Sequence, residues 1–276
     1  MNSVTQNKLF ASLGHIAAVM ASLVMFVPVY LVVVNSLKSR AEASSLSPGL
    51  PTELHWENFA VVIEQGKLWS GFLNSLLYSA GSTAIGTVIA AMAAFVLSRR
   101  RTPMNRFVYF FLIMGIALPV NFFTLTEVMQ MTQLINTRQG MIILYAALQI
   151  PFAVFLIYGF IESIPRELDE AATIDGCGPF QLFFSIILPL LTPVLATAAI
   201  LNFLFVWSDF IFPLYYLNSS GNWPMTLAVY NFFGQYQQDW NLVSADILLT
   251  ILPVIAVYLV GQRFILSGLT SGSVKG

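Results

Sequence analysis

The sequence predicts an all-α, polytopic membrane protein with six transmembrane helices, and two observations carry this fold class. Hydrophobic residues make up 57% of the 276 residues and charged residues only 9%, whereas a soluble domain carries about 25% charged residues. In addition, six long uncharged stretches alternate with polar segments. A spanning segment must satisfy its own backbone hydrogen bonds in lipid, so each stretch is expected to form a helix.

The expected spans follow from their lengths, because a helix needs about 20 apolar residues to cross the hydrocarbon core. Four stretches meet this requirement: residues 16–34, 72–97, 107–126 and 141–161. The fifth, residues 180–208, is too long, so part of it is expected outside the bilayer core. The sixth, residues 247–262, is short, and the Arg263 side chain is expected to reach the interface from its end. Prolines inside four spans are expected to kink them: Pro28, Pro119, Pro151 and Pro253.

The distribution of basic residues predicts the orientation of the chain. Eight of the twelve lysines and arginines lie on the side that holds the N-terminus, the second and fourth connections and the C-terminal tail. Basic residues favour the cytoplasmic side, so both termini are expected there. The cluster Arg99–Arg101 is interpreted as a topology anchor, in preference to a patch for lipid phosphate or nucleic acid. The single cysteine, Cys177, excludes an intrachain disulfide and a multi-cysteine metal site.

The connection between the fourth and fifth spans predicts two short helices on the cytoplasmic side. Ser163 is expected to cap the first helix, with Pro165 in its first turn. Its residues fall on one face at helical spacing: Leu168, Ala171, Ala172 and Asp175. Gly176 and Gly178 are expected to end this helix, and Pro179 to begin another that continues into the fifth span. On geometry alone, an ordinary surface elbow is an alternative interpretation.

The residues of this connection resemble the EAA motif of ABC importer permeases at every fixed position. The matching residues are Glu170, Ala171, Ala172, Gly176, Ile186, Leu188 and Pro189. Further segments resemble the carbohydrate-uptake branch, the MalG-like subunits: residues 51–52, 58–59, 72–75, 164–168, 207–210 and 268–276. Cys177 departs from the small residue, such as alanine, that the family usually has there, but cysteine is also small.

This resemblance implies the type I ABC importer permease fold, as a single transmembrane permease domain over residues 1–276. Its core spans would cover about residues 72–270, with a cytoplasmic coupling segment at residues 163–189. The chain would be the permease subunit of an ATP-driven importer for a sugar or oligosaccharide, in a bacterial or archaeal plasma membrane. The implied partners are a MalF-like second permease, a dimer of ATPase subunits, an extracytoplasmic solute-binding protein and membrane lipid, but no nucleic acid.

The resemblance also assigns roles to residues of the coupling segment. Glu170 would contact a basic groove on the ATPase, Ala171 and Ala172 would allow close seating, and Gly176 would form the turn. The remaining expected coupling residues are Asp175, Ile186, Leu188 and Pro189. No P-loop sequence occurs in the chain, so ATP and Mg are expected on the partner ATPase subunits and no cofactor on this chain.

Two further sets of residues are weaker candidates. Asn202, Trp207, Asp209 and Tyr215 are expected on the fifth span or just beyond it, where they would line a substrate pathway, contribute to an interfacial aromatic belt, or form a solvated helix end. The aromatic loop over residues 218–246 has three candidates for contact with the binding protein: Asn231, Phe233 and Tyr236. A helix lying in the membrane interface is the alternative for that loop. The rival functions are a self-sufficient secondary carrier and a multi-span membrane enzyme, for which the sequence offers no catalytic constellation.

Overall fold

The structure is a computed structural model that describes residues 3–232 and 239–271. In these residues all regular elements are helices, joined by turns and loops, and there is no β-strand. The chain divides into two compact units. The first comprises Met1–Leu68 and Ala228–Ile251, and the second comprises Trp69–Leu227 and Leu252–Gly276.

The first unit contains α1 (Ser3–Ser36), α2 (Arg40–Ala43), α3 (Glu57–Gln65), η3 (Val229–Phe232) and the beginning of α14 (Trp240–Ser271). Within α1, the segment Leu13–Ser36 has a mean hydropathy of 2.5, and none of its most apolar window is buried inside the chain. Burial inside the chain therefore does not account for the apolar composition of this helix, whereas a surrounding lipid bilayer would accommodate its apolar side chains.

A buried asparagine fastens the end of α1 to the start of α14. Asn58 Nδ2 donates to the carbonyls of Ser36 and Lys38, both at 2.9 Å. Its Oδ1 accepts a hydrogen bond of 2.8 Å from Asn241 Nδ2. A buried side-chain amide whose donor and acceptor atoms are both hydrogen-bonded holds its partners in place. Asn58 therefore has a structural role, and it belongs to residues 58–59, one of the segments that resemble the carbohydrate-uptake branch.

The loop after α1 is held by a capping box at the start of α2. Ser39 Oγ accepts from the Glu42 amide, and the Glu42 carboxylate accepts from the Ser39 amide. Thr52 donates to the same carboxylate through its hydroxyl at 2.5 Å and its amide at 3.2 Å. The Thr52 and Ser39 hydrogen bonds favour the charged form and lower the pKa of Glu42 to about 2. Nearby, a hydrogen bond to Glu57 raises the pKa of His55.

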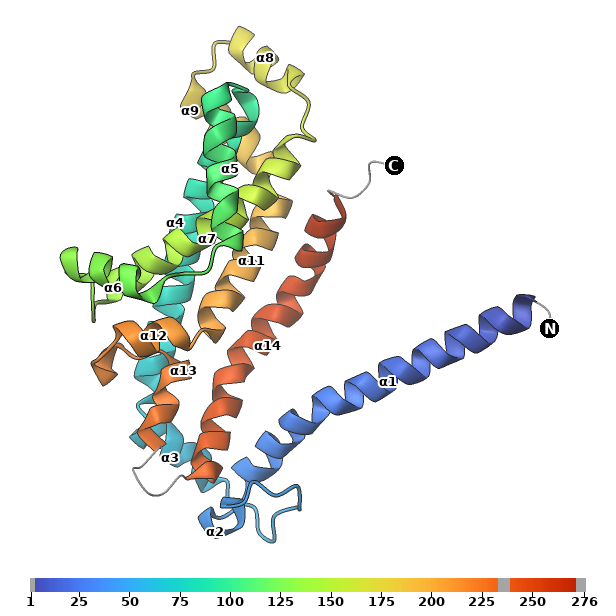
Figure 1. Cartoon of the computed structure of the whole chain (residues 1–276), viewed down its shortest axis with the longest axis vertical. Coiled ribbons are helices and arrows are strands. Elements are labelled where there is room, and N and C mark those ends of the chain that lie inside the picture. Colours follow the sequence, from blue (N-terminus) through green and yellow to red (C-terminus); the bar gives the residue numbers. More distant parts are fainter. Residues whose placement is uncertain (1–2, 233–238, 272–276) are drawn as a thin grey trace. The chain divides into compact units, whose positions relative to one another are not determined.

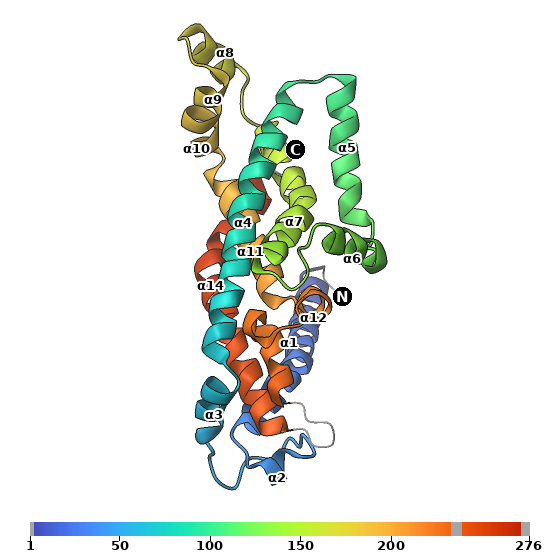
Figure 2. The same cartoon turned by 90° about the vertical axis from the view of Figure 1, so that its left-hand side faces the viewer.

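The second unit is built around α4 (Leu68–Arg99), α7 (Arg138–Ile161) and α11 (Thr192–Ser208), which run alongside one another, with α5 (Pro103–Ala117) packed on α7 (Figures 1 and 2). Small residues let α4 and α7 approach closely. A Cβ added at Gly86 would lie 3.2 Å from the Ala146 carbonyl. One core cluster lies among these helices and includes Ala90, Ala94, Ala153, Ile157 and Ile187.

Two of the expected spans are bent. The third is broken into α5 and α6 (Phe122–Met131), which meet at 114°, and the fifth bends by 77° at Leu191 before α11. The prediction that Pro119 kinks a continuous helix is wrong, because α5 ends at Ala117 and Pro119 lies between the two helices. The fifth stretch is therefore not one straight helix, and the expectation that part of it lies outside the bilayer core stays a prediction.

The sixth expected span is longer than predicted. Helix α14 begins at Trp240, before the uncharged stretch, and runs to Ser271. Asp246, placed outside the span by the sequence, therefore lies inside the helix, where it is buried. Three glycines and three small hydroxyl residues in residues 268–276 predict a tail too flexible to be helical. This prediction is wrong as far as Ser271, where α14 ends, and residues 272–276 lie outside the described part. Among the described residues, four helices are long and apolar enough to cross a membrane, or six if each bent pair counts as one span.

The end of the second unit away from α8 (Glu167–Ile174) is closed by α12 (Ile211–Tyr216), η2 (Ser220–Asn222) and the start of α13 (Met225–Ala228). Asn74 Nδ2 donates to the carbonyls of Gly221 and Trp223 at 2.9 and 3.0 Å. Ser75 Oγ accepts from the Met225 amide at 2.9 Å. Asn74 and Ser75, in another segment that resembles the carbohydrate-uptake branch, therefore anchor this loop to α4.

Candidate functional site

The coupling segment has the helix–turn–helix geometry that the sequence predicts. Helix α8 ends at Ile174, and Gly176 adopts a φ of +86°, a backbone conformation that L side chains rarely adopt. Gly178 then precedes α9 (Pro179–Gln181), with Pro179 in its first turn. The predicted beginning is wrong, because α8 starts after Arg166, and the Ser163 hydroxyl donates to the Phe160 carbonyl at the end of α7.

The chain enters the fifth span through a π-helix, which sequence periodicity does not reveal. This element, η1 (Leu182–Ile187), leads into α10 (Leu188–Leu190). A π-helix adds a residue per turn and frequently marks functional sites. The motif residues Ile186 and Leu188 pack against the core cluster, while Pro189 is exposed. These positions thus connect the coupling segment to the bundle.

The outer surface of the coupling segment carries an acid and exposed apolar side chains. Glu170 and Ala171 are exposed, whereas Ala172 is only 5% exposed, so the prediction that both alanines face outward is wrong for Ala172. Sequence analysis missed two large apolar residues: Ile174 is 86% exposed and Phe180 is 73% exposed. Both flank the Gly176 turn, so this end of the coupling segment exposes apolar side chains beside the Glu170 carboxylate.

Helix α8 is tied to the end of α4 by a mostly buried ion pair. Arg99 Nε lies 2.6 Å from Asp169 Oδ2, and the two side chains are 11% and 17% exposed. Arg99 also donates to the Ile164 carbonyl through Nη1 at 3.2 Å. A cavity of about 430 Å³ lies beside this pair, with Cys177 among its lining residues. Low exposure strengthens the attraction between the two charges.

A second polar set joins the same two segments. Arg101 Nη2 lies 2.6 Å from Glu162 Oε2, and the Ser98 hydroxyl donates to Glu162 Oε1 at 2.7 Å. Arg166 Nη2 donates to the Ser98 carbonyl at 3.3 Å. Two of the three arginines that the sequence suggested as topology anchors, Arg99 and Arg101, therefore also hold the coupling segment in position.

The candidates at the other end of the fifth span are mostly structural. Trp207 is 2% exposed, and its ring lies 5.5 Å from that of Phe203. Asp209 Oδ2 accepts from the Tyr145 hydroxyl at 2.8 Å and from the Phe212 amide at 3.0 Å, so Asp209 fixes the start of α12 and is not a solvated helix end. Tyr215 is 58% exposed on α12.

Asn202 lines a cavity of about 460 Å³ between α5, α7 and α11. Its walls are mainly apolar, and Gln149 of α7 is a second amide in the lining. Gln149 Nε2 donates to the Asn202 carbonyl at 3.4 Å. Gln149 Oε1 and Asn202 Nδ2 are buried and have no hydrogen-bond partner among the described residues. Buried polar atoms normally have partners, so these two amides are suited to a polar ligand.

The candidate contacts for a binding protein are only partly described. Asn231 Nδ2 donates to the Gly66 carbonyl at 3.0 Å, which gives it a structural role within the first unit. Phe233 and Tyr236 lie outside the described residues. Of the neighbouring aromatics, Tyr230 is exposed but Phe232 is buried.

Comparisons with known proteins place this geometry in a family. Residues 86–269 match the family described as binding-protein-dependent transport system inner membrane component. The diacetylchitobiose uptake system permease protein NgcG of Streptomyces coelicolor is 32% identical over 99% of this chain and 92% of that protein. The melibiose/raffinose/stachyose import permease protein MelC of Bacillus subtilis is 34% identical over 91% of this chain and 92% of that protein.

A solved structure supports the same fold. A chain of a bacterial ABC transporter involved in the import of the acidic polysaccharide alginate superposes with a TM-score of 0.80, at 20% identity, over 94% of this chain and 97% of that chain. The expected ABC importer permease fold is therefore confirmed. With a matched region that includes the coupling segment, the chain belongs to the binding-protein-dependent transport system inner membrane components, and it is a transport subunit of an ABC importer, not an enzyme.

Proposed function

We propose that this chain imports a sugar or oligosaccharide together with a second permease, two ATPase subunits and an extracytoplasmic solute-binding protein. Both relatives above are named for carbohydrate uptake. Carbohydrates are rich in hydroxyl groups, and the cavity at Asn202 and Gln149 combines apolar walls with two amides that each have one unpaired atom. Amides recognise hydroxyl groups through both their donor and their acceptor atoms.

The proposed coupling role is supported mainly by the exposed surface around the Gly176 turn. Glu170 offers a charge and Ile174 and Phe180 offer apolar area to the ATPase. The Arg99–Asp169 pair transmits a displacement of α8 to α4, since a charge pair with such low exposure resists separation. ATP and Mg belong to the ATPase partner in this proposal, and the coupling residues move with it without performing chemistry.

The sidedness proposed is cytoplasmic for the coupling segment and both termini, in a bacterial or archaeal plasma membrane. Its support is the excess of basic residues on that side. A cysteine introduced at Ser271 is expected to react with a membrane-impermeant maleimide only from the cytoplasm, and one at Asn222 only from outside, after Cys177 is replaced by alanine. Labelling of Ser271 from outside would reverse the assignment.

The test of the function is uptake into proteoliposomes. The complete complex, with binding protein and a panel of oligosaccharides outside and ATP inside, is expected to accumulate at least one of them. A collapsed ion gradient should leave uptake unchanged. Uptake by the chain alone, driven by an ion gradient, would instead establish the rival secondary carrier.

Two variants separate coupling from the pathway. Glu170→Lys places a positive charge against the proposed basic groove, so ATP hydrolysis should no longer respond to the loaded binding protein. Asn202→Leu keeps the coupling surface intact and removes one amide from the cavity, so uptake should fall while basal ATP hydrolysis stays normal. Substrate-stimulated uptake at the wild-type rate in Glu170→Lys would overturn the coupling assignment.

A further inference from the structure

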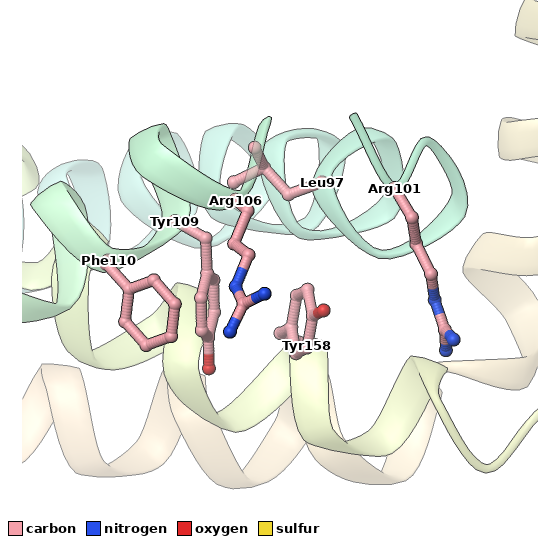
Figure 3. A pocket seen from close by; sticks show the side chains of 6 residues that line it. All are labelled: Leu97, Arg101, Arg106, Tyr109, Phe110 and Tyr158. Atoms are coloured by element: carbon pink, nitrogen blue, oxygen red, sulfur yellow. The ribbon is translucent and has the colours of Figure 1, made fainter. Parts of the chain in front are cut away.

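A small cavity near the arginine cluster has the chemistry of an anion site. It has a volume of about 310 Å³ and is lined by residues of α4, α5 and α7 and of the connection between α4 and α5: Leu97, Arg101, Arg106, Tyr109, Phe110 and Tyr158 (Figure 3). The figure shows the Arg106 guanidinium beside the rings of Tyr109 and Tyr158. None of these residues belongs to the exposed surface around the Gly176 turn.

The cavity carries one uncompensated positive charge. Arg101 is neutralised by Glu162 at 2.6 Å. Arg106 has no carboxylate within ion-pair distance in the described part of the chain, and its guanidinium carbon lies 5.8 Å from the centre of the Phe110 ring. A guanidinium without an acidic partner binds phosphate oxygens well, because its donors form a planar fork.

Hydroxyl groups and a neighbouring apolar surface complete the site. The rings of Tyr109 and Tyr158 pack with their centres 4.1 Å apart. Across the described residues neither hydroxyl has a protein acceptor. Away from the arginine, α5 exposes a stripe of apolar side chains along one face, at Phe107, Phe111 and Met114. A phosphate in the cavity would therefore have an apolar surface about 10 Å long next to it, against which the first part of an acyl chain could lie.

The position along the helices identifies the source of that phosphate. The cavity lies where α4 ends at Arg99 and α5 begins at Pro103, which is the boundary between an apolar span and water. Basic pockets between transmembrane helices at this depth bind the head groups of anionic lipids. We propose that Arg106, with the hydroxyls of Tyr109 and Tyr158, binds the phosphodiester of an anionic phospholipid whose acyl chain lies along α5.

The test uses the complete complex in nanodiscs of phosphatidylcholine, with or without phosphatidylglycerol, and counts retained phosphatidylglycerol by native mass spectrometry. Removing one interfacial charge is expected to weaken retention about fivefold, so Arg106→Gln should lower it by that factor. Arg106→Lys keeps the charge without the planar fork, and should lower retention less than Arg106→Gln. Tyr158→Phe removes one hydroxyl while keeping the ring, and should also lower retention.

Arg100→Gln is the matched control, because Arg100 lies in the connection just before α5 but lines a different cavity. It should retain phosphatidylglycerol at the wild-type level. Equal losses in Arg100→Gln and Arg106→Gln would reduce the effect to general surface charge and overturn the site. Undiminished retention in both Arg106→Gln and Tyr158→Phe would overturn it as well. Displacement of the lipid by inorganic phosphate at equal concentration would show a free-anion site and contradict the assignment to lipid.

Discussion

Replacement of Asp169 by asparagine is the most direct perturbation of the link between the coupling helix and the bundle. The substitution preserves the size and shape of the side chain and removes its charge. Arg99 then keeps its hydrogen bonds to the Ile164 carbonyl and loses the carboxylate that lies 2.6 Å from its Nε atom. The guanidinium stays mostly buried with its charge uncompensated.

The magnitude follows from that burial. Removing one partner of a buried ion pair costs about 3–5 kcal/mol. The two side chains are 11% and 17% exposed, and water therefore offsets part of this cost. We take the lower end, about 3 kcal/mol. Because about 1.4 kcal/mol corresponds to a factor of ten, local detachment of α8 should become about a hundredfold more frequent.

Hydrogen exchange of the α8 amides measures this opening in the assembled complex, since local unfolding exposes them to solvent. The expected result for Asp169→Asn is exchange about a hundredfold faster in peptides covering Glu167–Ile174, with faster maleimide labelling of Cys177 in the adjoining cavity. The control is Asp175→Asn, which removes an exposed acid from the same segment and should leave both rates unchanged. Wild-type exchange in Asp169→Asn would refute the reasoning that the ion pair holds α8.

Three further predictions concern other parts of the chain. Gly176→Ala should destabilise the coupling turn by about 1–2 kcal/mol, because φ is +86° there and an L residue in a left-handed conformation carries that cost. Gly178 has a negative φ and open space around it, so Gly178→Ala should be neutral. Thermal unfolding of the complex measures both variants. The lowered pKa of Glu42 contributes stability that is fully present above its ordinary value of 4.5 and is lost progressively as the pH falls from 4.5 through about 2. At about pH 3 part of this stability remains in the wild type, so pepsin should cleave the loop more slowly in the wild type than in Glu42→Gln. Deletion of residues 270–276 should leave the chain inserted and lower the yield and uptake rate of the complex, and equal values for both would remove any role of the tail.

The fold was predictable because lipid imposes a simple rule on composition. Long uncharged stretches must be helical, and five of the six expected spans contain a helix long enough, or a bent pair of helices, at the expected place; the sixth differs only in its greater length. The errors in the predicted helix bounds lie at a proline and a charged residue within or beside the apolar stretches. Pro119 ends a helix where a kink was expected, and Asp246 enters a helix because neighbouring apolar residues continue past it.

The position of the glycine turn in the coupling segment could be predicted from the sequence. Which side chains the segment exposes could not. Glycine and proline spacing determines where α8 ends and α9 begins, since these residues restrict the backbone directly. The exposure of Ile174 and Phe180, the inward position of Ala172 and the Arg99–Asp169 pair depend on tertiary packing between segments distant in sequence. No periodicity within one segment reports such contacts. The sequence did contain one signal for the exposure of Ile174 and Phe180, because each is a large apolar residue next to the expected glycine turn.

The central claim is that a partner ATPase drives this chain through the coupling segment, and site-specific photocrosslinking tests it most directly. A photoreactive phenylalanine analogue at position 174, which is 86% exposed in α8, is compared with the same analogue at position 131, which is 80% exposed in α6. The two helices lie at separate places on the bundle (Figure 1). The account predicts a crosslink to the ATPase subunit from position 174 and none from position 131. Absence of the crosslink from position 174 in a complex that still transports sugar would contradict it.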